Sequence, residues 1–237
     1  HCRTPWHVYC SLNKSIEPSV SLQITHITEP KMFELYLASK SPRRKQILEQ
    51  LGYRPIVLAT NDHTLRNFVG DEVQLENESP EDYVLRVSKE KALIALGKIQ
   101  DRGLEPLPVL AADTTVIADG LILGKPDDQA QACDFLRRMS GKRHEVRTAV
   151  WVGTDENNLR SAVSVSYVWF KPLTEEEIQT YVRLAEPYDK AGGYAIQGLA
   201  GAFIERIEGS YTGIMGLPVF ETVALLKQFG INLFKNQ

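Results

Sequence analysis

The short basic segment Ser39-Lys40-Ser41-Pro42-Arg43-Arg44 combines residue types that bind phosphate. It follows the apolar run 35–38, which predicts a buried strand, and Pro42 suits the first turn of a helix that Ser41 caps. The free N–H groups and positive dipole end of such a helix attract anions, and two arginines add bidentate donors. The segment predicts either a phosphate site or a capped surface helix whose arginines are solvated.

A carboxylate follows a second predicted buried strand. Asp113 comes directly after the apolar run 109–112, so it is expected where that strand emerges from the core. A charge at such a place is costly to bury without a partner. Two interpretations remain open: a turn or cap residue at a strand end, or a general base or metal ligand beside a substrate.

Two lysines add to the positive charge. Lys91 lies within a predicted helix, and Lys125 follows the hairpin signal Asp119-Gly120. If the hairpin folds back, Lys125 comes close to Asp113. Either lysine alone fits a solvated surface residue, but together with the two arginines they would supply the cationic cluster that a triphosphate requires.

A glutamine lies in a glycine-rich stretch, in Tyr194-Ala195-Ile196-Gln197-Gly198. Glycines allow a close approach of the backbone, and an amide offers both a donor and an acceptor to the edge of a base. A flexible linker that happens to contain one glutamine fits the same residues. The pattern GxxxxGK[ST] of a P-loop is not present in the sequence.

Caps, turn residues and hydrophobic periodicity predict the elements that would position these side chains. The predicted helices cover 42–51, 79–97, 126–141, 174–185 and 218–229, and the predicted strands cover 35–38, 55–60, 109–112, 121–123, 144–153, 162–170 and 202–207. Helices and strands alternate, but hairpins occur among them. We therefore expect an α/β protein with a mixed central β-sheet flanked by helices, in two lobes that share a cleft.

The composition sets limits on the class of protein. The 237 residues are 43% hydrophobic, and 27 basic against 30 acidic side chains give a formal charge of -3. This balance gives no general attraction to nucleic acid, and no apolar run is long enough to span a membrane. Three cysteines without CxxC spacing favour a reducing, cytoplasmic compartment. We expect residues 1–31 to be an extension outside the fold and 32–237 to form one domain.

Taken in order, several segments resemble the Maf family of nucleotide pyrophosphatases. The similarity covers roughly residues 33–232. Its carriers are LYLASKSPRR (35–44), SKEKA (88–92), AADTTVIADGLILGKP (111–126), MSGKRHEVRTAV (139–150), EPYDKAGGYAIQG (186–198) and IEGSYTGIMGLP (207–218). So many motifs in the family's order are highly specific.

The resemblance implies a fold related to the inosine triphosphate pyrophosphatases, a divalent cation such as Mg or Mn, and often a homodimer. It implies hydrolysis of a nucleoside triphosphate to the monophosphate and pyrophosphate, a house-cleaning activity. The family's proton acceptor falls on Asp113. The positions that sort substrates fall on Arg43, Thr114 and Gln197, which look like the branch that acts on dTTP and UTP, with CTP or modified pyrimidine nucleotides as further substrates.

We expect the phosphates to contact a set of hydroxyl and cationic side chains, while Thr114 shapes the base pocket and Gln197 reads the pyrimidine. The phosphate set is Ser39, Ser41, Arg43, Arg44, Lys91 and Lys125. A metal would be held by Asp113 and Asp62. Here the sequence departs from the family, because His63 follows Asp62 where a second acidic residue is usual.

Two other functions fit the residues. One is a non-catalytic nucleotide-binding regulator of septum formation, which the histidine at position 63 favours. The other is the same hydrolysis applied to purine nucleotides such as ITP. Comparison of dTTP, UTP, CTP and ITP in a pyrophosphate-release assay separates these alternatives.

Overall fold

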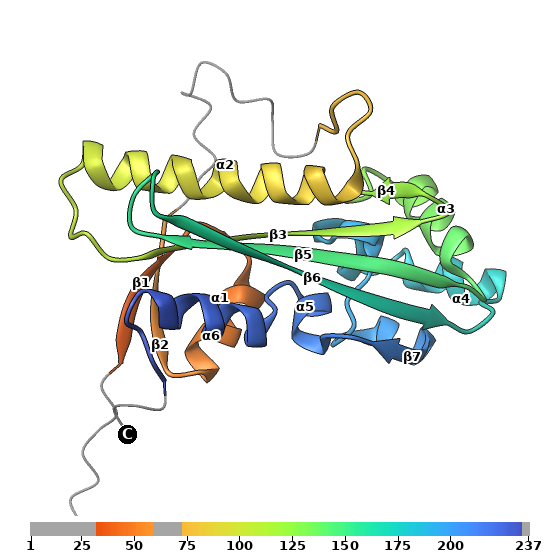
Figure 1. The fold of residues 1–237 in the computed structure, drawn as a ribbon. Coiled ribbons are helices and arrows are strands. Elements are labelled where there is room, and N and C mark those ends of the chain that lie inside the picture. Colours follow the sequence, from red (N-terminus) through yellow and green to blue (C-terminus); the bar gives the residue numbers. More distant parts are fainter. Residues whose placement is uncertain (1–31, 59–72, 234–237) are drawn as a thin grey trace, which may run out of the picture.

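The computed structural model describes residues 32–58 and 73–233, which form one mixed seven-stranded sheet with helices on both faces (Figure 1). The strand order is β2-β1-β3-β5-β6-β7, and β4 pairs with β3. Strand β1 is parallel to β2 and β3, and the other pairs are antiparallel. The strands are β1 Phe33–Leu37, β2 Tyr53–Val57, β3 Val109–Ala118, β4 Leu121–Leu123, β5 Arg143–Gly153, β6 Leu159–Phe170 and β7 Ile204–Glu208. The predicted mixed α/β class is confirmed.

The helices are distributed over both faces and one end of the sheet (Figure 1). Helix α2 covers one face, α1, α5 and α6 lie on the other, and α3 and α4 lie at the end where β4 and β7 are found. The α-helices are α1 Pro42–Gln50, α2 Pro80–Asp101, α3 Gln129–Met139, α4 Glu175–Tyr181, α5 Tyr211–Met215 and α6 Val219–Gln228, and the 3₁₀ helices are η1 Glu186–Asp189, η2 Ala191–Gly193 and η3 Leu199–Phe203.

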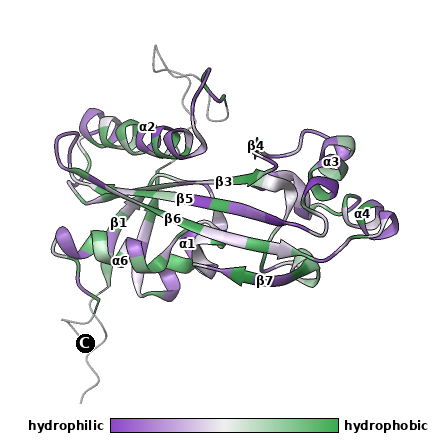
Figure 2. Ribbon diagram, turned by 45° about the vertical axis from the view of Figure 1, so that its right-hand side comes forward, coloured by the Kyte–Doolittle hydropathy of each residue, from purple (hydrophilic) through white to green (hydrophobic). Residues whose placement is uncertain are grey.

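Local sequence explains where α2 begins. The Ser79 hydroxyl accepts a hydrogen bond from the Asp82 N–H, and Pro80 occupies the first turn. The helix ends at Asp101, later than the predicted 97, because Gly97 is tolerated inside it. A glycine there costs about 1 kcal/mol relative to alanine, and burial of Ile99 in the next turn offsets that cost. Figure 2 shows hydrophilic and hydrophobic residues along the length of α2, as expected for a helix with one buried face.

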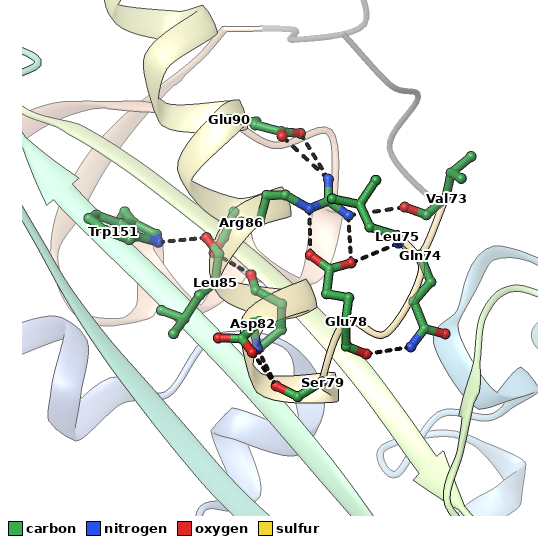
Figure 3. Close-up of polar contacts among 12 residues, drawn as sticks. Val73, Gln74, Leu75, Glu78, Ser79, Asp82, Leu85, Arg86, Glu90 and Trp151 are labelled. Carbon is green, nitrogen blue, oxygen red and sulfur yellow. Dashed lines mark hydrogen bonds and ion pairs between the residues drawn. The ribbon is translucent and has the colours of Figure 1, made fainter.

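An ionic cluster fixes the residues that lead into α2 (Figure 3). The Arg86 guanidinium donates to Glu78 at 2.6 Å, to Glu90 at 3.3 Å and to the Val73 carbonyl at 3.0 Å. The hydrogen bond between the Arg86 and Glu78 side chains raises the pKa of Arg86 and lowers the pKa of Glu78. The cluster ties the segment 73–78 to one side of the helix.

Successive side chains of β3, a strand that carries site residues, point alternately to the two faces of the sheet. In β3, Val109 and Ala111 face the cluster under α2, whereas Leu110 and Ala112 face the cluster under α1 and α6. The strand runs on to Ala118, six residues beyond the predicted end at 112, because cross-strand pairing with β5 continues through its polar part. The prediction that Asp113 ends this strand was therefore wrong.

One face of strand β6 is buried, and this face carries two serines. Ser164 and Ser166 are buried, whereas Val165 is exposed. The Ser166 hydroxyl accepts a hydrogen bond from the Ser210 N–H at 2.9 Å. A Cβ on Gly209 would lie 2.7 Å from the same hydroxyl oxygen, so small side chains on both segments permit close packing. This segment leads into α5, a helix that the sequence pattern did not predict.

Two predicted helix bounds were too wide. Helix α3 begins at Gln129 rather than 126, since the Asp128 carboxylate caps it by accepting from the Gln131 N–H. Helix α4 ends at Tyr181 rather than 185, and a capping box between Thr174 and Glu177 fixes its start.

Candidate functional site

A cleft of about 520 Å³ opens between the start of α1, the middle of β3 and the turns η1 and η2. It brings together all the predicted substrate and catalytic residues that the structure describes. These are Ser39, Ser41, Arg43, Arg44, Lys91, Asp113, Thr114, Lys125 and Gln197. The predicted metal ligand Asp62, and His63 beside it, lie outside the described residues.

Two residues that line the cleft form an ion pair. Lys91 Nζ lies 2.7 Å from Asp113 Oδ1, and the two side chains are 13% and 15% exposed. Asp113 sits in the middle of β3, where it pairs with Ala149 of β5. Because a strand in the interior of a sheet moves little, the carboxylate is presented from a rigid position, and the long helix α2 supplies its cation.

Arg44 lines the cleft and also stabilises the fold around it. Its guanidinium donates to the Gly216 carbonyl at 2.7 Å, to Ser39 Oγ at 3.0 Å and to Thr114 Oγ1 at 3.2 Å. Burial lowers the pKa of Arg44, and the nearby Asp113 carboxylate opposes that effect. The arginine therefore fixes three segments around the cleft, which its place in a basic motif did not predict.

Ser41 occupies the N-cap position of α1, but its side chain makes no capping hydrogen bond. Its N–H instead donates to Ser39 Oγ at 3.2 Å. The predicted side-chain cap was wrong, while the predicted proline in the first turn is present. Two donors, this N–H and the Arg44 guanidinium, meet the Ser39 oxygen, so the Ser39 O–H is left to donate.

A chain of hydroxyls holds Thr114. Thr148 Oγ1 lies 2.8 Å from the Gly213 carbonyl and 3.0 Å from Thr114 Oγ1. A carbonyl only accepts, so the Thr148 proton is committed to Gly213, and the Thr114 hydroxyl donates to Thr148. The remaining side of Thr114 Oγ1 faces the Arg44 guanidinium. Thr148 is fully buried and was missed because its role depends on partners far apart in the sequence.

Arg43 links α1 to the opposite wall of the cleft. Its Nη1 lies 3.3 Å from Asp189 Oδ2 in η1. Asp189 also pairs with Lys190, whose Nζ donates to the Glu186 carbonyl at 2.8 Å. Lys190 lines the cleft and adds a further cation to the predicted set. Asp189 and Lys190 lie inside the segment EPYDKAGGYAIQG, yet residue type alone did not single them out.

Glycine conformation places Lys125 beside the turn η2. Gly192 has φ +69°, and a Cβ there would lie 2.9 Å from the Val116 side chain. Its N–H donates to the Gly124 carbonyl at 2.9 Å, immediately before Lys125. Only glycine combines this backbone conformation with such close contact. The hairpin therefore does fold back and brings Lys125 into the cleft, as predicted.

The cleft offers hard oxygen donors that suit a small divalent cation. The carboxylates of Asp113 and Asp189 both line it. Mg²⁺ is commonly bound by one or two carboxylates together with the phosphates of a substrate. In the described ranges no group of three or more His, Cys, Asp or Glu side chains is placed to hold a metal ion. Nor do those ranges contain a helix long and apolar enough to cross a membrane.

A mixed sheet with a cationic cleft around one lysine-paired carboxylate defines an α/β protein with a pocket for a polyanion. A family model described as Maf-like protein matches residues 34–229, and the chain belongs to this family. A dTTP/UTP pyrophosphatase of Nitrosomonas europaea is 47% identical over 84% of this chain and 96% of that protein. One from Pasteurella multocida is 49% identical over 85% of this chain and 98% of that protein.

The solved structures that match this chain have lower sequence identity to it. The Ham1 protein of Staphylococcus aureus is 11% identical, with a TM-score of 0.39 over 83% of this chain and 97% of that one. A nucleoside-triphosphatase, dITP/XTP pyrophosphatase, of Mycobacterium abscessus is 17% identical, with a TM-score of 0.35 over 58% of this chain and 74% of that one.

Proposed function

We propose that this chain hydrolyses nucleoside triphosphates, dTTP and UTP foremost, to the monophosphate and pyrophosphate. The observation that carries the proposal is the convergence of Arg43, Arg44, Lys91 and Lys125 on one cleft around Asp113. Four cations from three segments of the chain around one carboxylate suit a polyphosphate beside a proton acceptor. Relatives at 47% and 49% identity that carry the name dTTP/UTP pyrophosphatase support the same activity.

The proposed reaction is attack of water on the α-phosphorus. The water oxygen forms a bond to phosphorus, the bond to the bridging oxygen breaks, and pyrophosphate leaves with that electron pair. Asp113 accepts the water proton, and Lys91 keeps its carboxylate oriented at 2.7 Å. Arg43 and Lys125 lower the energy of the charge that moves onto the leaving group.

A divalent cation, Mg or Mn, is proposed to bind at Asp113 and Asp62. When bound, such an ion neutralises phosphate charge and lowers the pKa of water. The oxygen chemistry of Asp113 in the cleft fits a hard cation. The residues of this chain would also hold the substrate. The Ser39 hydroxyl, oriented by Arg44, would donate to a phosphate oxygen, and Ser41 lines the same cleft.

Base selection is proposed to depend on Gln197 and Thr114. The Gln197 amide can both donate to and accept from a pyrimidine edge, and it lines the cleft from the glycine-rich turn. Thr114 contributes through Arg44, because its hydroxyl is already engaged with Thr148 and Arg44. Gln197 is exposed in this structure, and a bound base would cover it. A base with the wrong edge would then leave the covered amide unpaired, which is a source of discrimination.

The test is release of pyrophosphate from dTTP, UTP, CTP and ITP with Mg. Asp113→Asn is expected to lower kcat at least about 100-fold while nucleotide binding persists, since it removes the general base. Asp101→Asn, at the exposed end of α2, is a matched control with the same change of charge. Near-full turnover by Asp113→Asn would remove Asp113 from its role. Binding without turnover by the unaltered protein would instead support a regulator.

A second substitution tests base selection. Gln197→Glu is expected to weaken use of dTTP and UTP more than use of the other nucleotides, because the amide donor becomes an acceptor. An equal loss with every nucleotide would show that the residue does not read the base.

We also propose that the protein acts as a cytoplasmic homodimer that binds neither nucleic acid nor membrane. Family resemblance supports the dimer, and the formal charge of -3 supports the lack of nucleic-acid binding. Light scattering after gel filtration tests the dimer, and a monomer at micromolar concentration would contradict it.

A further inference from the structure

Glu186 is a charged side chain next to the cleft that the proposed hydrolysis does not use. It begins η1, and its carboxylate is turned toward the loop that carries Gln197. Oε2 accepts from the Leu199 N–H at 3.1 Å, and Oε1 accepts from the Ala200 N–H at 3.3 Å. These are the first two residues of η3 and follow directly after Gln197 and Gly198. The carboxylate therefore holds the C-terminal end of the loop that carries Gln197.

The loop itself is shaped to receive this carboxylate. A Cβ on Gly198 would lie 2.3 Å from Glu186 Oε2 and 2.5 Å from its Cδ, closer than atoms can approach. The Gly198 N–H also donates to the Ala195 carbonyl at 3.0 Å, which closes a turn around Gln197. The backbone of Gln197 is therefore held between a turn on one side and an anchored helix start on the other.

A buried tyrosine fixes the carboxylate in turn. The Tyr181 hydroxyl, from α4, donates to Glu186 Oε1 at 2.8 Å. Burial raises the pKa of Tyr181, and Glu186 raises it further, so the hydroxyl stays a donor. Three donors from two elements thus meet one carboxylate, and α4 is connected through Glu186 to the wall of the cleft.

We propose that Glu186 is a positioning residue that sets where the Gln197 amide meets the base, and so controls selection among nucleotides rather than the hydrolytic step. The inference rests on the proposed function, in which Gln197 reads the pyrimidine. Hydrogen-bond discrimination depends on placement within a fraction of an ångström. A small shift of the loop therefore reduces the advantage of the preferred base more than it affects the phosphate end.

The first test is Glu186→Gln, which keeps the shape but replaces one acceptor oxygen by an NH₂ group. One of the three donors then loses its partner. We expect kcat/KM for dTTP to fall about tenfold, as for the loss of one hydrogen bond, and kcat/KM for CTP to change less than about twofold. Competitive inhibition by inorganic triphosphate, a probe of the phosphate end alone, should stay constant. Glu176→Gln, on the exposed side of α4, is the matched control.

An unchanged ratio of dTTP to CTP would overturn the inference. So would an equal loss for both nucleotides and for inorganic triphosphate, because that pattern indicates general distortion of the cleft. Absence of turnover in the unaltered protein would refute the proposed function separately. The same ratio would then be measured as binding of dTTP and CTP by calorimetry, with the same expected change.

A double-substitution cycle isolates the contact itself. Gly198→Ala places a methyl group against the Glu186 carboxylate and should reduce the dTTP preference severalfold. In a chain that already carries Glu186→Ala the methyl group no longer meets the carboxylate, so the added alanine should cost much less. Additive effects of the two substitutions would show that the carboxylate does not hold the loop.

Discussion

His144 predicts how the stability of this protein depends on pH. The ring lies in β5, is 2% exposed, and contacts the rings of Phe170 and Tyr194 at centroid distances of 4.9 and 5.4 Å. Its Nε2 lies 2.8 Å from the Tyr194 hydroxyl. Burial lowers the pKa of His144 to about 3, so the folded protein keeps this ring neutral between pH 7 and pH 5.

The size of this pH effect follows from the difference between the pKa of His144 in the folded chain and in the unfolded chain. An unfolded histidine has a pKa of about 6.5, so below that pH the unfolded chain binds a proton that the folded chain does not. Stability from this group is therefore present above pH 6.5 and is lost as the pH falls toward 3. At pH 5 the linkage amounts to about 2 kcal/mol relative to pH 7, a large share of the stability of an ordinary domain.

The assay is urea unfolding at pH 7, 6 and 5, compared between the unaltered protein and His144→Gln. Glutamine keeps a hydrogen-bonding nitrogen near the Tyr194 hydroxyl but does not titrate. The difference in unfolding free energy between the two proteins should narrow by about 2 kcal/mol between pH 7 and pH 5. Tyr194→Phe, which keeps the histidine, should retain the steep profile. Parallel profiles for His144→Gln and the unaltered protein would refute the reasoning.

Three further outcomes are expected. Lys91→Met leaves the Asp113 carboxylate without its partner at 2.7 Å and should lower the free energy of unfolding by about 3 kcal/mol. Urea unfolding should show at least half of that loss restored when Asp113→Asn is added. No restoration would disprove the coupling. Thr148→Val leaves the Thr114 hydroxyl and the Gly213 carbonyl without their buried partner. It should lower the free energy of unfolding by about 2 kcal/mol and lower the ratio of kcat/KM for dTTP to kcat/KM for CTP. A free energy of unfolding that stays within about 0.5 kcal/mol of the unaltered protein contradicts this prediction. Removal of divalent metal with EDTA should stop pyrophosphate release until Mg is added, and turnover that persists argues against the proposed metal.

Sequence predicted those parts of the fold that depend on near neighbours. The start of α2 at Ser79-Pro80 and the capping box at Thr174 are local hydrogen-bonding features, and both are present. The end of β3 was missed, because polar residues continue a strand when a neighbouring strand pairs with them. Helix α5 was missed because five residues that include Gly213 show little periodicity.

The candidate site divides in the same way. Residue type and resemblance together predicted which side chains line the cleft, including Lys125, whose place depends on a local hairpin. They did not predict that Arg44 binds the Gly216 carbonyl, 172 residues along the chain, or that Thr148 orients Thr114. Contacts of this kind depend on the register of the sheet and on how distant turns pack, which single-sequence patterns do not contain.

The length of β3 and β5 has a consequence for motion. Nine paired positions join the two strands, and β3 contributes Leu110 to the core beneath α1 and α6 and Val116 to the core beneath α3. Any swing of one half of the molecule against the other would have to bend this ladder. The part of the cleft that lies on β3, including Asp113, is therefore set before any ligand binds, and binding should not require this ladder to bend.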